Sequence, residues 1–455
     1  MFRLASLTCS GAKGRLWIAV ATVAVLLATA APVQAVPFAY VTDGHNVHQY
    51  EIVAGGLLAP MTPATVTAGG QSPTAMAVSP DGKSLYAANE DSGIVSQYDI
   101  GPSGALSPKS PATVTTGYLS SPQGVAVSPD GESVYVTLGG YENVAQYDVG
   151  SGGELSPKSP ATVASGAYPR GIAVSPDGQS VYVTDHIQAN VWQYDVGPGG
   201  ALSPKSPATV SYVGDGAIGV AVSPDGHSVY VTPFDMRAVA QFDVGPGGAL
   251  SPKSPAEVPA DDFETTGVAV SPDGESVYVT NNYGASVSQY HVGAGGLLAP
   301  MAPATVAADE GPYGVAVSPD GESVYVPNRG TDSHACLDDL RTCGTVSQYD
   351  VGEAGKLSPK SPAEVATGTG GGAVGVAVSP ALVPTTNKQC EHGGWKEWGF
   401  RAQGRCIPFV KRNARHSCRG ARKVIGRHAF RKEYGKGKHH RRAWHRCVKQ
   451  TVRGR

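Results

Sequence analysis

The sequence predicts an all-β protein: a seven-bladed β-propeller followed by a small basic module at the C-terminal end. A four-residue turn, "SPDG", recurs at intervals of 47 to 49 residues. Each copy follows a "GVAV"-like run and precedes a "VYVT"-like run. A period of this length, rich in Gly and in short β-prone runs, is typical of propeller blades. The copies lie at Ser79–Gly82, Ser128–Gly131, Ser175–Gly178, Ser223–Gly226, Ser271–Gly274 and Ser318–Gly321.

The first 35 residues are typical of a secretory signal. Arg3, Lys13 and Arg15 give a positive start, an apolar run follows over residues 16–31, and Val33-Gln34-Ala35 offers a small-residue cleavage site. We therefore expect a secreted or envelope-associated protein with no membrane span after removal of the signal. An uncleaved N-terminal anchor is the alternative.

Each repeat divides into four strands. "GVAV" is expected to be the innermost strand, "SVYVT" the second and "VSQYDV" the third. "SPATV" is expected to be the outer strand, after a Gly-rich connection "GPGGALSPKS". Enrichment in Val, Tyr and Thr between Gly and Pro clusters favours strands throughout.

The two ends of the repeat region complement each other. The earliest strand of the second kind lies in Phe38–Gly44, and no inner strand precedes it. The last inner strand is Gly375–Val378, and no strand of the second kind follows it. We expect these two to pair, which closes the ring and leaves no open sheet edge. The propeller therefore spans residues 36–383, and the basic module spans 384–455.

The turn itself is expected to be structural. Pro presets φ near −65°, Asp bonds its own backbone, and Gly accepts positive φ. Because a catalytic residue is not needed six times around a ring, we interpret the turn aspartates as scaffold: Asp81, Asp130, Asp177, Asp225, Asp273 and Asp320.

The repeat also resembles a known family. Tyr278-Val279-Thr280-Asn281 is the signature of YVTN-type propeller repeats, and the wider pattern resembles the lactonase-like seven-bladed propellers, related to 6-phosphogluconolactonases and carboxymuconate-cyclising enzymes. This resemblance covers Val36–Val383. It implies either an enzyme acting on lactones or muconates or a surface protein. In the tail, Cys390–Val410 resembles a small cysteine-paired module of bacterial exported proteins.

Candidate site residues come from the loops that differ between copies, because loops on a rigid scaffold usually carry specificity. The residue before each inner strand should lie at the mouth of the central channel, and Arg170 is the only charged residue at that register. An Arg among aromatic rings suits a small anionic ligand; a pairing of Arg170 with a loop carboxylate is the structural alternative. The seven residues of this register are Thr74, Gln123, Arg170, Ile218, Thr266, Tyr313 and Val374.

The sequence leaves open whether the protein is an enzyme. A lactonase needs a polarised carbonyl and an activated water. The catalytic candidates are Arg170, His186, Asp185, Asp261, Asp262 and Glu264, and the ligand-binding candidates are Arg170, Tyr168, Tyr313, His186 and Arg237. No cofactor and no metal site is predicted, and a structural Ca²⁺ held by loop oxygens is the alternative.

Six cysteines remain once the signal is removed, and an even number in an exported protein favours disulfides. Cys336 and Cys343 lie in an insertion, Asn328–Gly344, that decorates one blade, and we expect them to pair with each other. This insertion is either a wall of the binding site or a tolerated loop. Two further disulfides are expected, with open pairing, among Cys390, Cys406, Cys418 and Cys447.

Charge divides the chain sharply. Residues 384–455 hold 21 Lys and Arg against 3 acidic residues, whereas the remainder holds 14 against 34. A tail of this kind should bind an anionic envelope polymer or polysaccharide. We interpret the chain as a monomeric, exported binding or surface protein that presents a variable loop face and is held at the envelope by its tail. The alternative is a lactonase-like hydrolase acting on a lactone or a carboxylate-bearing small molecule.

Deletion of residues 384–455 should release the protein from cell-envelope fractions, because the deletion removes the segment that holds 21 basic against 3 acidic residues. Fractionation of cells that express the full or the truncated chain measures this, and retention of the full chain should weaken as salt rises. Equal retention of both chains would contradict the anchoring role.

Overall fold

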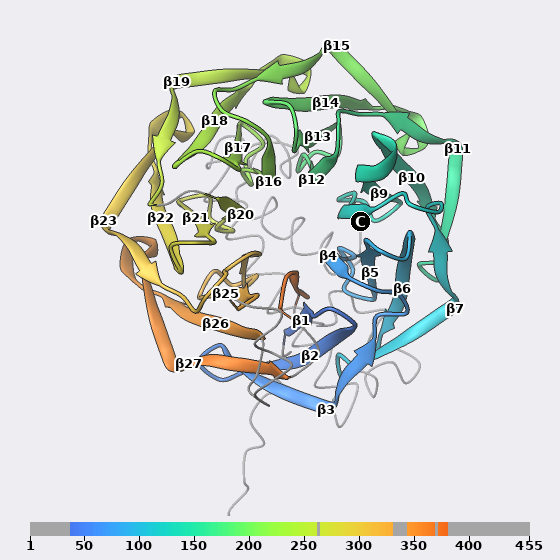
Figure 1. Cartoon of the computed structure of the whole chain (residues 1–455), viewed down its shortest axis with the longest axis horizontal. Coiled ribbons are helices and arrows are strands. Elements are labelled where there is room, and N and C mark those ends of the chain that lie inside the picture. The colour runs from blue at the N-terminus through green and yellow to red at the C-terminus, as the bar shows by residue number, and fades with distance from the viewer. Residues whose placement is uncertain (1–36, 262–263, 331–343, 369–371, 381–455) are drawn as a thin grey trace, which may run out of the picture. The chain divides into compact units, whose positions relative to one another are not determined.

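The described part of the chain forms seven antiparallel sheets arranged around one axis (Figure 1). The structure is a computed structural model that describes residues 37–261, 264–330, 344–368 and 372–380. Each sheet has four strands, and the predicted all-β, seven-bladed propeller is confirmed. No helix in these ranges is long and apolar enough to cross a membrane.

Every blade contributes one strand to each of four concentric positions. The innermost strands are β4 (Pro73–Val78), β8 (Pro122–Val127), β12 (Pro169–Val174), β16 (Ala217–Val222), β20 (Thr265–Val270), β24 (Ala316–Val317) and β28 (Val376–Val378). The second strands are β1 (Phe38–Thr42), β5 (Ser84–Asn89), β9 (Ser133–Leu138), β13 (Ser180–Asp185), β17 (Ser228–Pro233), β21 (Ser276–Asn281) and β25 (Ser323–Asn328).

The remaining strands lie further from the axis. The third strands are β2 (Asn46–Val53), β6 (Ile94–Ile100), β10 (Asn143–Val149), β14 (Asn190–Val196), β18 (Ala238–Val244), β22 (Ser286–Val292) and β26 (Gly344–Val351). The outer strands are β3 (Leu57–Thr67), β7 (Leu106–Thr115), β11 (Leu155–Ala164), β15 (Leu202–Ser211), β19 (Leu250–Pro259), β23 (Leu298–Ala307) and β27 (Leu357–Gly368). Short 3₁₀ turns are η1 (Gly139–Tyr141), η2 (Pro198–Gly200), η3 (Pro246–Gly248), η4 (Ala294–Gly296) and η5 (Glu353–Gly355).

The ring closes as predicted. Strand β28 pairs antiparallel with β1, with Val378 opposite Ala39 and Val376 opposite Val41. The Thr42 side chain adds to the closure, because its Oγ1 accepts a hydrogen bond of 2.8 Å from the backbone amide of Gly375. The last strand of the propeller therefore completes its first blade.

The SPDG turns have the expected structural role. In the first copy the Ser79 hydroxyl donates to Asp81 Oδ1 over 2.6 Å, and the same oxygen accepts the Lys83 amide over 3.0 Å. Gly82 has a φ of 72°, a conformation that L side chains rarely adopt. The Ser-to-Asp bond recurs in the other five copies, so each turn aspartate serves its own loop.

The outer strands correct one prediction from sequence. They begin at the Leu of "ALSPKS", so only the Gly-rich "GPGGA" part is a connection. Proline in this segment is tolerated because the strand lies at the edge of its blade. Pairing between the third and the outer strand is interrupted near the centre of the outer strand. Between β6 and β7, for example, Ser96 pairs with Thr113, and the next pair is Tyr98 with Pro108.

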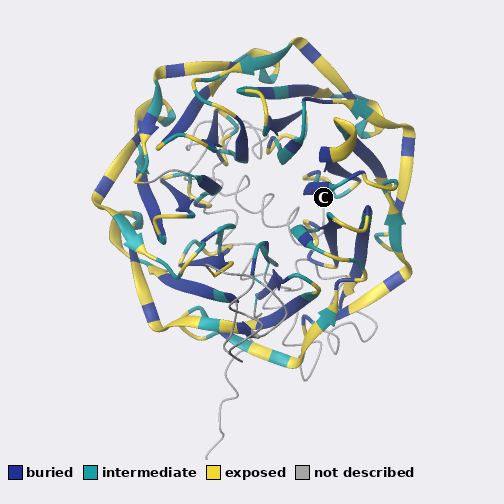
Figure 2. Cartoon of the chain, viewed as in Figure 1, coloured by how far each residue is buried: buried dark blue, intermediate teal, exposed yellow. Residues whose placement is uncertain are grey.

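Antiparallel order gives the ring two different faces. We call the face with the SPDG turns and Gly-rich connections the turn face, and we call the opposite face, where second strands lead into third strands, the loop face. The second strands are wholly buried in each blade, as in β13, whereas exposed residues concentrate on the outer strands (Figure 2). The core thus lies between neighbouring blades.

Buried side chains also link each blade to the next. In the third strands, Gln193 donates to the carbonyl of Pro207 in its own blade over 2.9 Å. The same amide accepts the backbone N–H of Leu250, in the next blade, over 2.9 Å. The other six third strands place a Gln in the same pair of bonds. A second set of links runs from the second-strand tyrosines, such as Tyr182 to the Gly248 carbonyl over 2.7 Å.

Substitution of Gln193 by Leu should lower the free energy of unfolding by roughly 2–4 kcal/mol, since it leaves two buried backbone groups without a partner. The midpoint of urea unfolding measures this loss. Lys253→Met is the matched control: Lys253 also bridges two blades, but Met61 and Met301 fill the same position in two other blades. An equal loss in both variants would contradict a special role for the glutamine.

Candidate functional site

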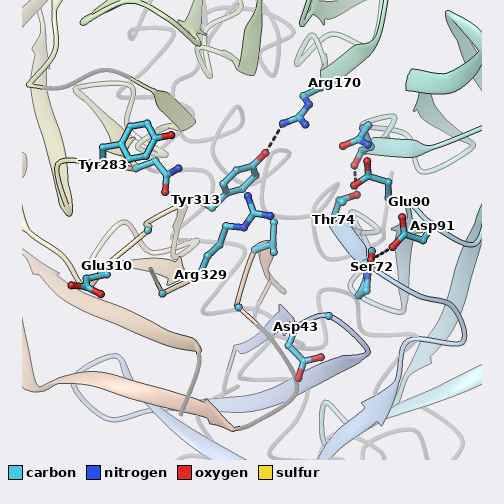
Figure 3. A pocket seen from close by; sticks show the side chains of 18 of the residues that line it. Asp43, Ser72, Thr74, Glu90, Asp91, Arg170, Tyr283, Glu310, Tyr313 and Arg329 are labelled. Atoms are coloured by element: carbon cyan, nitrogen blue, oxygen red, sulfur yellow. Dashed lines mark hydrogen bonds between the residues drawn. The ribbon is translucent and has the colours of Figure 1, made fainter. Parts of the chain in front are cut away.

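A cavity of about 730 Å³ opens at the channel mouth on the loop face (Figure 3). Five of the seven residues predicted for this mouth line it: Thr74, Gln123, Arg170, Tyr313 and Val374. The other two, Ile218 and Thr266, are buried and lie outside the lining. The register argument from sequence therefore located the cavity, although the ligand-binding and catalytic roles of these residues stay predictions.

Two arginines converge on one tyrosine in this cavity. Arg170 Nη1 donates a hydrogen bond of 2.7 Å to the hydroxyl of Tyr313, and the Arg329 guanidinium lies 4.8 Å from the centre of the same ring. The Arg170 Nε atom is buried without a partner. No carboxylate of the described ranges pairs with Arg170, so its guanidinium group is available to bind an anionic group.

A second network joins Glu90 and Gln123, which line the cavity, to Tyr168, which lies outside the lining. Tyr168 donates a hydrogen bond of 3.0 Å to Glu90 Oε1 and accepts one of 3.3 Å from the Gln123 side chain. Arg170 lies 5.6 Å from the centre of the Tyr168 ring. Burial, and secondly the charge of Glu90, raise the pKa of Tyr168, so the phenol stays protonated and remains a donor at neutral pH.

Further carboxylates complete the lining. Asp91 accepts a hydrogen bond from the Ser72 hydroxyl, and Glu310 lies on the opposite side (Figure 3). Asp43 is buried and bonded to His48 Nε2 over 2.6 Å. Burial alone would raise the pKa of Asp43, but bonds from His48 and from two backbone amides outweigh it and hold this pKa below its ordinary value.

The predicted pair of Asp185 and His186 lies beside the cavity and outside its lining. Asp185 is fully buried, and its oxygens accept the backbone amides of Ala167, Ile187 and Gln188 over 2.9 Å, so it holds its own loop. The His186 ring lies behind Tyr168, with ring centres 6.0 Å apart, and meets Phe234 edge-on at 4.9 Å. Burial, and secondly the charge of Arg170, lower the pKa of His186 to about 4.

The remaining candidates are spread over the loop face. Asp261 accepts a 3.3 Å bond from Ser286, and the carboxylate of Glu264 raises the pKa of Tyr283. Arg237 is exposed and lies outside the lining. Asp262 and the six cysteines lie outside the described residues, as do the signal segment, most of the insertion and the basic tail.

Sequence reasoning missed Glu90 and Arg329, although the repeat contains a signal for both. These residues follow directly after a second strand, a register that also points toward the channel. The residues of this register are Gly44, two residues after β1, and six residues that each follow their strand directly: Glu90, Gly139, His186, Phe234, Asn282 and Arg329. Gly44, Glu90, Asn282 and Arg329 line the cavity. A search of both registers would have placed the carboxylate and the second arginine.

The arrangement brings opposite chemical groups to two sides of one cavity. Arg170 donates to Tyr313, so the phenol hydrogen of Tyr313 is free to be donated to a carbonyl or carboxylate oxygen. Glu90 faces it with a carboxylate that is already held at one oxygen. Such a site can bind an anion or polarise a carbonyl beside a base. Within the described residues, no group of three or more His, Cys, Asp or Glu is arranged to hold a metal ion.

Comparison with known proteins agrees with this fold. The family model described as lactonase, seven-bladed beta-propeller, matches residues 34–297. The chain therefore belongs to the lactonase family of seven-bladed β-propellers. None of the curated proteins compared with the chain matches it.

Solved structures show the same propeller in several bacterial proteins. A candidate 6-phosphogluconolactonase from Bacteroides fragilis has a TM-score of 0.63 at 17% identity, covering 77% of this chain and 100% of that one. A protein from Lactobacillus plantarum scores 0.62 at 19% identity, with coverages of 76% and 100%. The periplasmic gluconolactonase of Pseudomonas aeruginosa scores 0.59 at 18% identity, with coverages of 76% and 99%. At these identities the likeness establishes the fold.

Substitution of His186 by Phe should make the protein less sensitive to acid. The folded-state pKa of His186, about 4, lies below its ordinary value of 6.5, so the unfolded chain binds more protons between these values. As the pH falls from about 6.5 toward 4, proton binding to His186 in the unfolded chain therefore lowers the free energy of unfolding. The variant should not show this part of the decrease.

Urea unfolding of both proteins across this pH range measures the difference. Parallel stability curves would contradict the lowered pKa of His186.

Proposed function

We propose that this protein hydrolyses a lactone at the loop-face cavity. The observation that carries the proposal is the convergence of Arg170 and Arg329 on Tyr313, across the cavity from the held carboxylate of Glu90. Membership of the lactonase family supports the hydrolase alternative over the surface-binding interpretation of the sequence. The candidate and named lactonases among the similar structures support the same choice.

In the proposed reaction, water attacks the lactone carbonyl carbon and Glu90 accepts its proton. The Tyr313 hydroxyl donates to the carbonyl oxygen, and the two guanidinium groups stabilise the negative charge that develops there. The ring C–O bond then breaks, and the proton passes from Glu90 to the leaving alkoxide. The product is a hydroxy acid that releases its carboxyl proton to solvent, and the resulting carboxylate remains beside Arg170 until it leaves.

The substrate should be polar. The lining combines arginines, carboxylates, the amides Gln123 and Asn282, and the tyrosines Tyr283 and Tyr313. Carboxylates and amides suit the hydroxyl groups of a sugar ring, while the arginines suit a carbonyl or a carboxylate. These features support an aldonolactone or a carboxylate-bearing lactone as the substrate class.

Export, attachment to an envelope polymer through the basic tail, and the monomeric state are further proposals that rest on the sequence alone. The N-terminal segment typical of a secretory signal supports export, and the excess of 21 basic over 3 acidic residues supports attachment. Neither is required for hydrolysis at the cavity.

Purified protein should accelerate the opening of glucono-1,5-lactone or its 6-phosphate above the spontaneous rate, followed with a pH indicator. Arg170→Gln should lower kcat/KM about 10²–10³-fold, since it removes a group that stabilises the oxyanion. Glu90→Gln should lower kcat about 10²–10⁴-fold, since it removes the base.

Lys83→Gln and Glu132→Gln are matched controls, because both remove one charge on the turn face, far from the cavity in the ring. Their activity should equal that of the parent protein. Activity that survives in both cavity variants would contradict the proposed site, and the absence of acceleration with every lactone tested would contradict the function.

A further inference from the structure

Tyr168 has a φ of 61°, in the left-handed region that residues other than Gly rarely adopt. The residues at the same register of three other blades, Ser72, Ser121 and Glu264, also have a positive φ. Strain of this kind costs on the order of 1–3 kcal/mol and persists where surrounding contacts enforce it. Here the neighbouring Ala167 amide donates to Asp185 over 2.9 Å, and the Tyr168 carbonyl accepts the His186 amide over 3.2 Å. The buried loop of Asp185 therefore fixes the backbone of Tyr168.

The neighbouring blade leaves room for the Tyr168 ring. At the register directly after its second strand this blade has Gly139, where other blades carry Glu90, His186 or Arg329. A Cβ atom at Gly139 would lie 3.1 Å from the Tyr168 ring, closer than side chains normally approach. The ring thus fills the position that a side chain of the neighbouring blade occupies elsewhere in the propeller.

From this position Tyr168 touches the groups to which we assign the chemistry. Its hydroxyl donates to Glu90 over 3.0 Å and accepts from Gln123 over 3.3 Å, and Arg170 lies 5.6 Å from its ring centre. These three partners come from three successive blades. The Tyr168 ring therefore contacts both the Glu90 carboxylate and the Arg170 guanidinium, two groups that line the cavity.

We propose that Tyr168 is a positioning residue that holds Glu90 through its hydroxyl and separates Glu90 from Arg170 through its ring. Without the ring, the carboxylate and the guanidinium could form an ion pair, which would occupy both groups and leave neither for the substrate. With the ring in place, Arg170 donates to Tyr313 instead, and Glu90 keeps one oxygen for a water molecule. This inference rests on the proposed function for its catalytic consequence.

The two functions of Tyr168 can be separated by two substitutions. Tyr168→Phe keeps the ring and removes the hydrogen bond that favours ionised Glu90, so the acidic limb of the kcat/KM–pH profile should move up by about one pH unit. Tyr168→Ala removes the ring and permits the ion pair between Glu90 and Arg170. Because the ion pair favours ionised Glu90, the acidic limb should move to lower pH. In this variant kcat/KM should fall at least about tenfold further than in Tyr168→Phe. Opposite shifts are the expected result. Tyr141→Phe, which removes a phenol bonded to a loop carbonyl outside the cavity lining, should leave the profile unchanged.

Limbs that do not move, or that move in the same direction in both variants, would overturn the proposal. A double-mutant cycle tests the contact without any activity: the unfolding free energies of the parent, Tyr168→Phe, Glu90→Gln and the double variant at neutral pH should be non-additive. If the parent hydrolyses no lactone, the proposed function fails, and a non-additive cycle still supports Tyr168 as the residue that holds Glu90. Additive energies would overturn that role as well.

Discussion

Seven buried glutamines, one in each third strand, hold neighbouring blades together, and the geometry of the ring depends on them. Each outer strand is interrupted near its centre, and a proline carbonyl such as Pro111 falls in the gap. The glutamine amide fills this gap and then accepts the first backbone amide of the next outer strand. A buried polar group is stabilising only when all its bonds are made. The bridge therefore fixes both the interruption in one blade and the start of its neighbour, and it keeps the loop face on a rigid support.

Inside the blades, one pair of positions changes together from blade to blade. The last residue of each second strand, or the one that directly follows it, faces a residue near the start of the third strand. In four blades these two side chains are hydrogen-bonded to each other: Asn89–Ser96, Asn281–Ser288, Asn328–Ser347 and Asp43–His48. In a fifth blade the two positions are apolar, and Leu138 and Ala145 belong to one buried cluster. The loops beyond these pairs differ between blades, and the cavity is built from those differences.

The sequence was sufficient for the ring and for part of the cavity. Repeat spacing predicted the blades, and the unmatched strands at the two ends predicted the closure. Register within the repeat predicted Arg170 and Tyr313 at the mouth, because a residue's distance from the axis follows from its place on a strand. The contact of Tyr168 with Glu90 could not be predicted from the sequence, since it depends on how far the loop that carries Tyr168 extends across two blades. The true start of the outer strands was also missed, because Pro and Lys there resemble a loop when the glutamine bridge is unknown.

The closure between β28 and β1 has a consequence for biosynthesis. The first blade made by the ribosome lacks its innermost strand until the chain has been extended by more than 330 residues, to the register of Gly375. Throughout that interval β1 presents an unpaired edge, the kind of surface on which strands of other chains can add. The protein thus emerges with this edge first and protects it last. A nascent chain that stalls between residues 368 and 376 has six four-stranded blades and a first blade that still lacks its innermost strand.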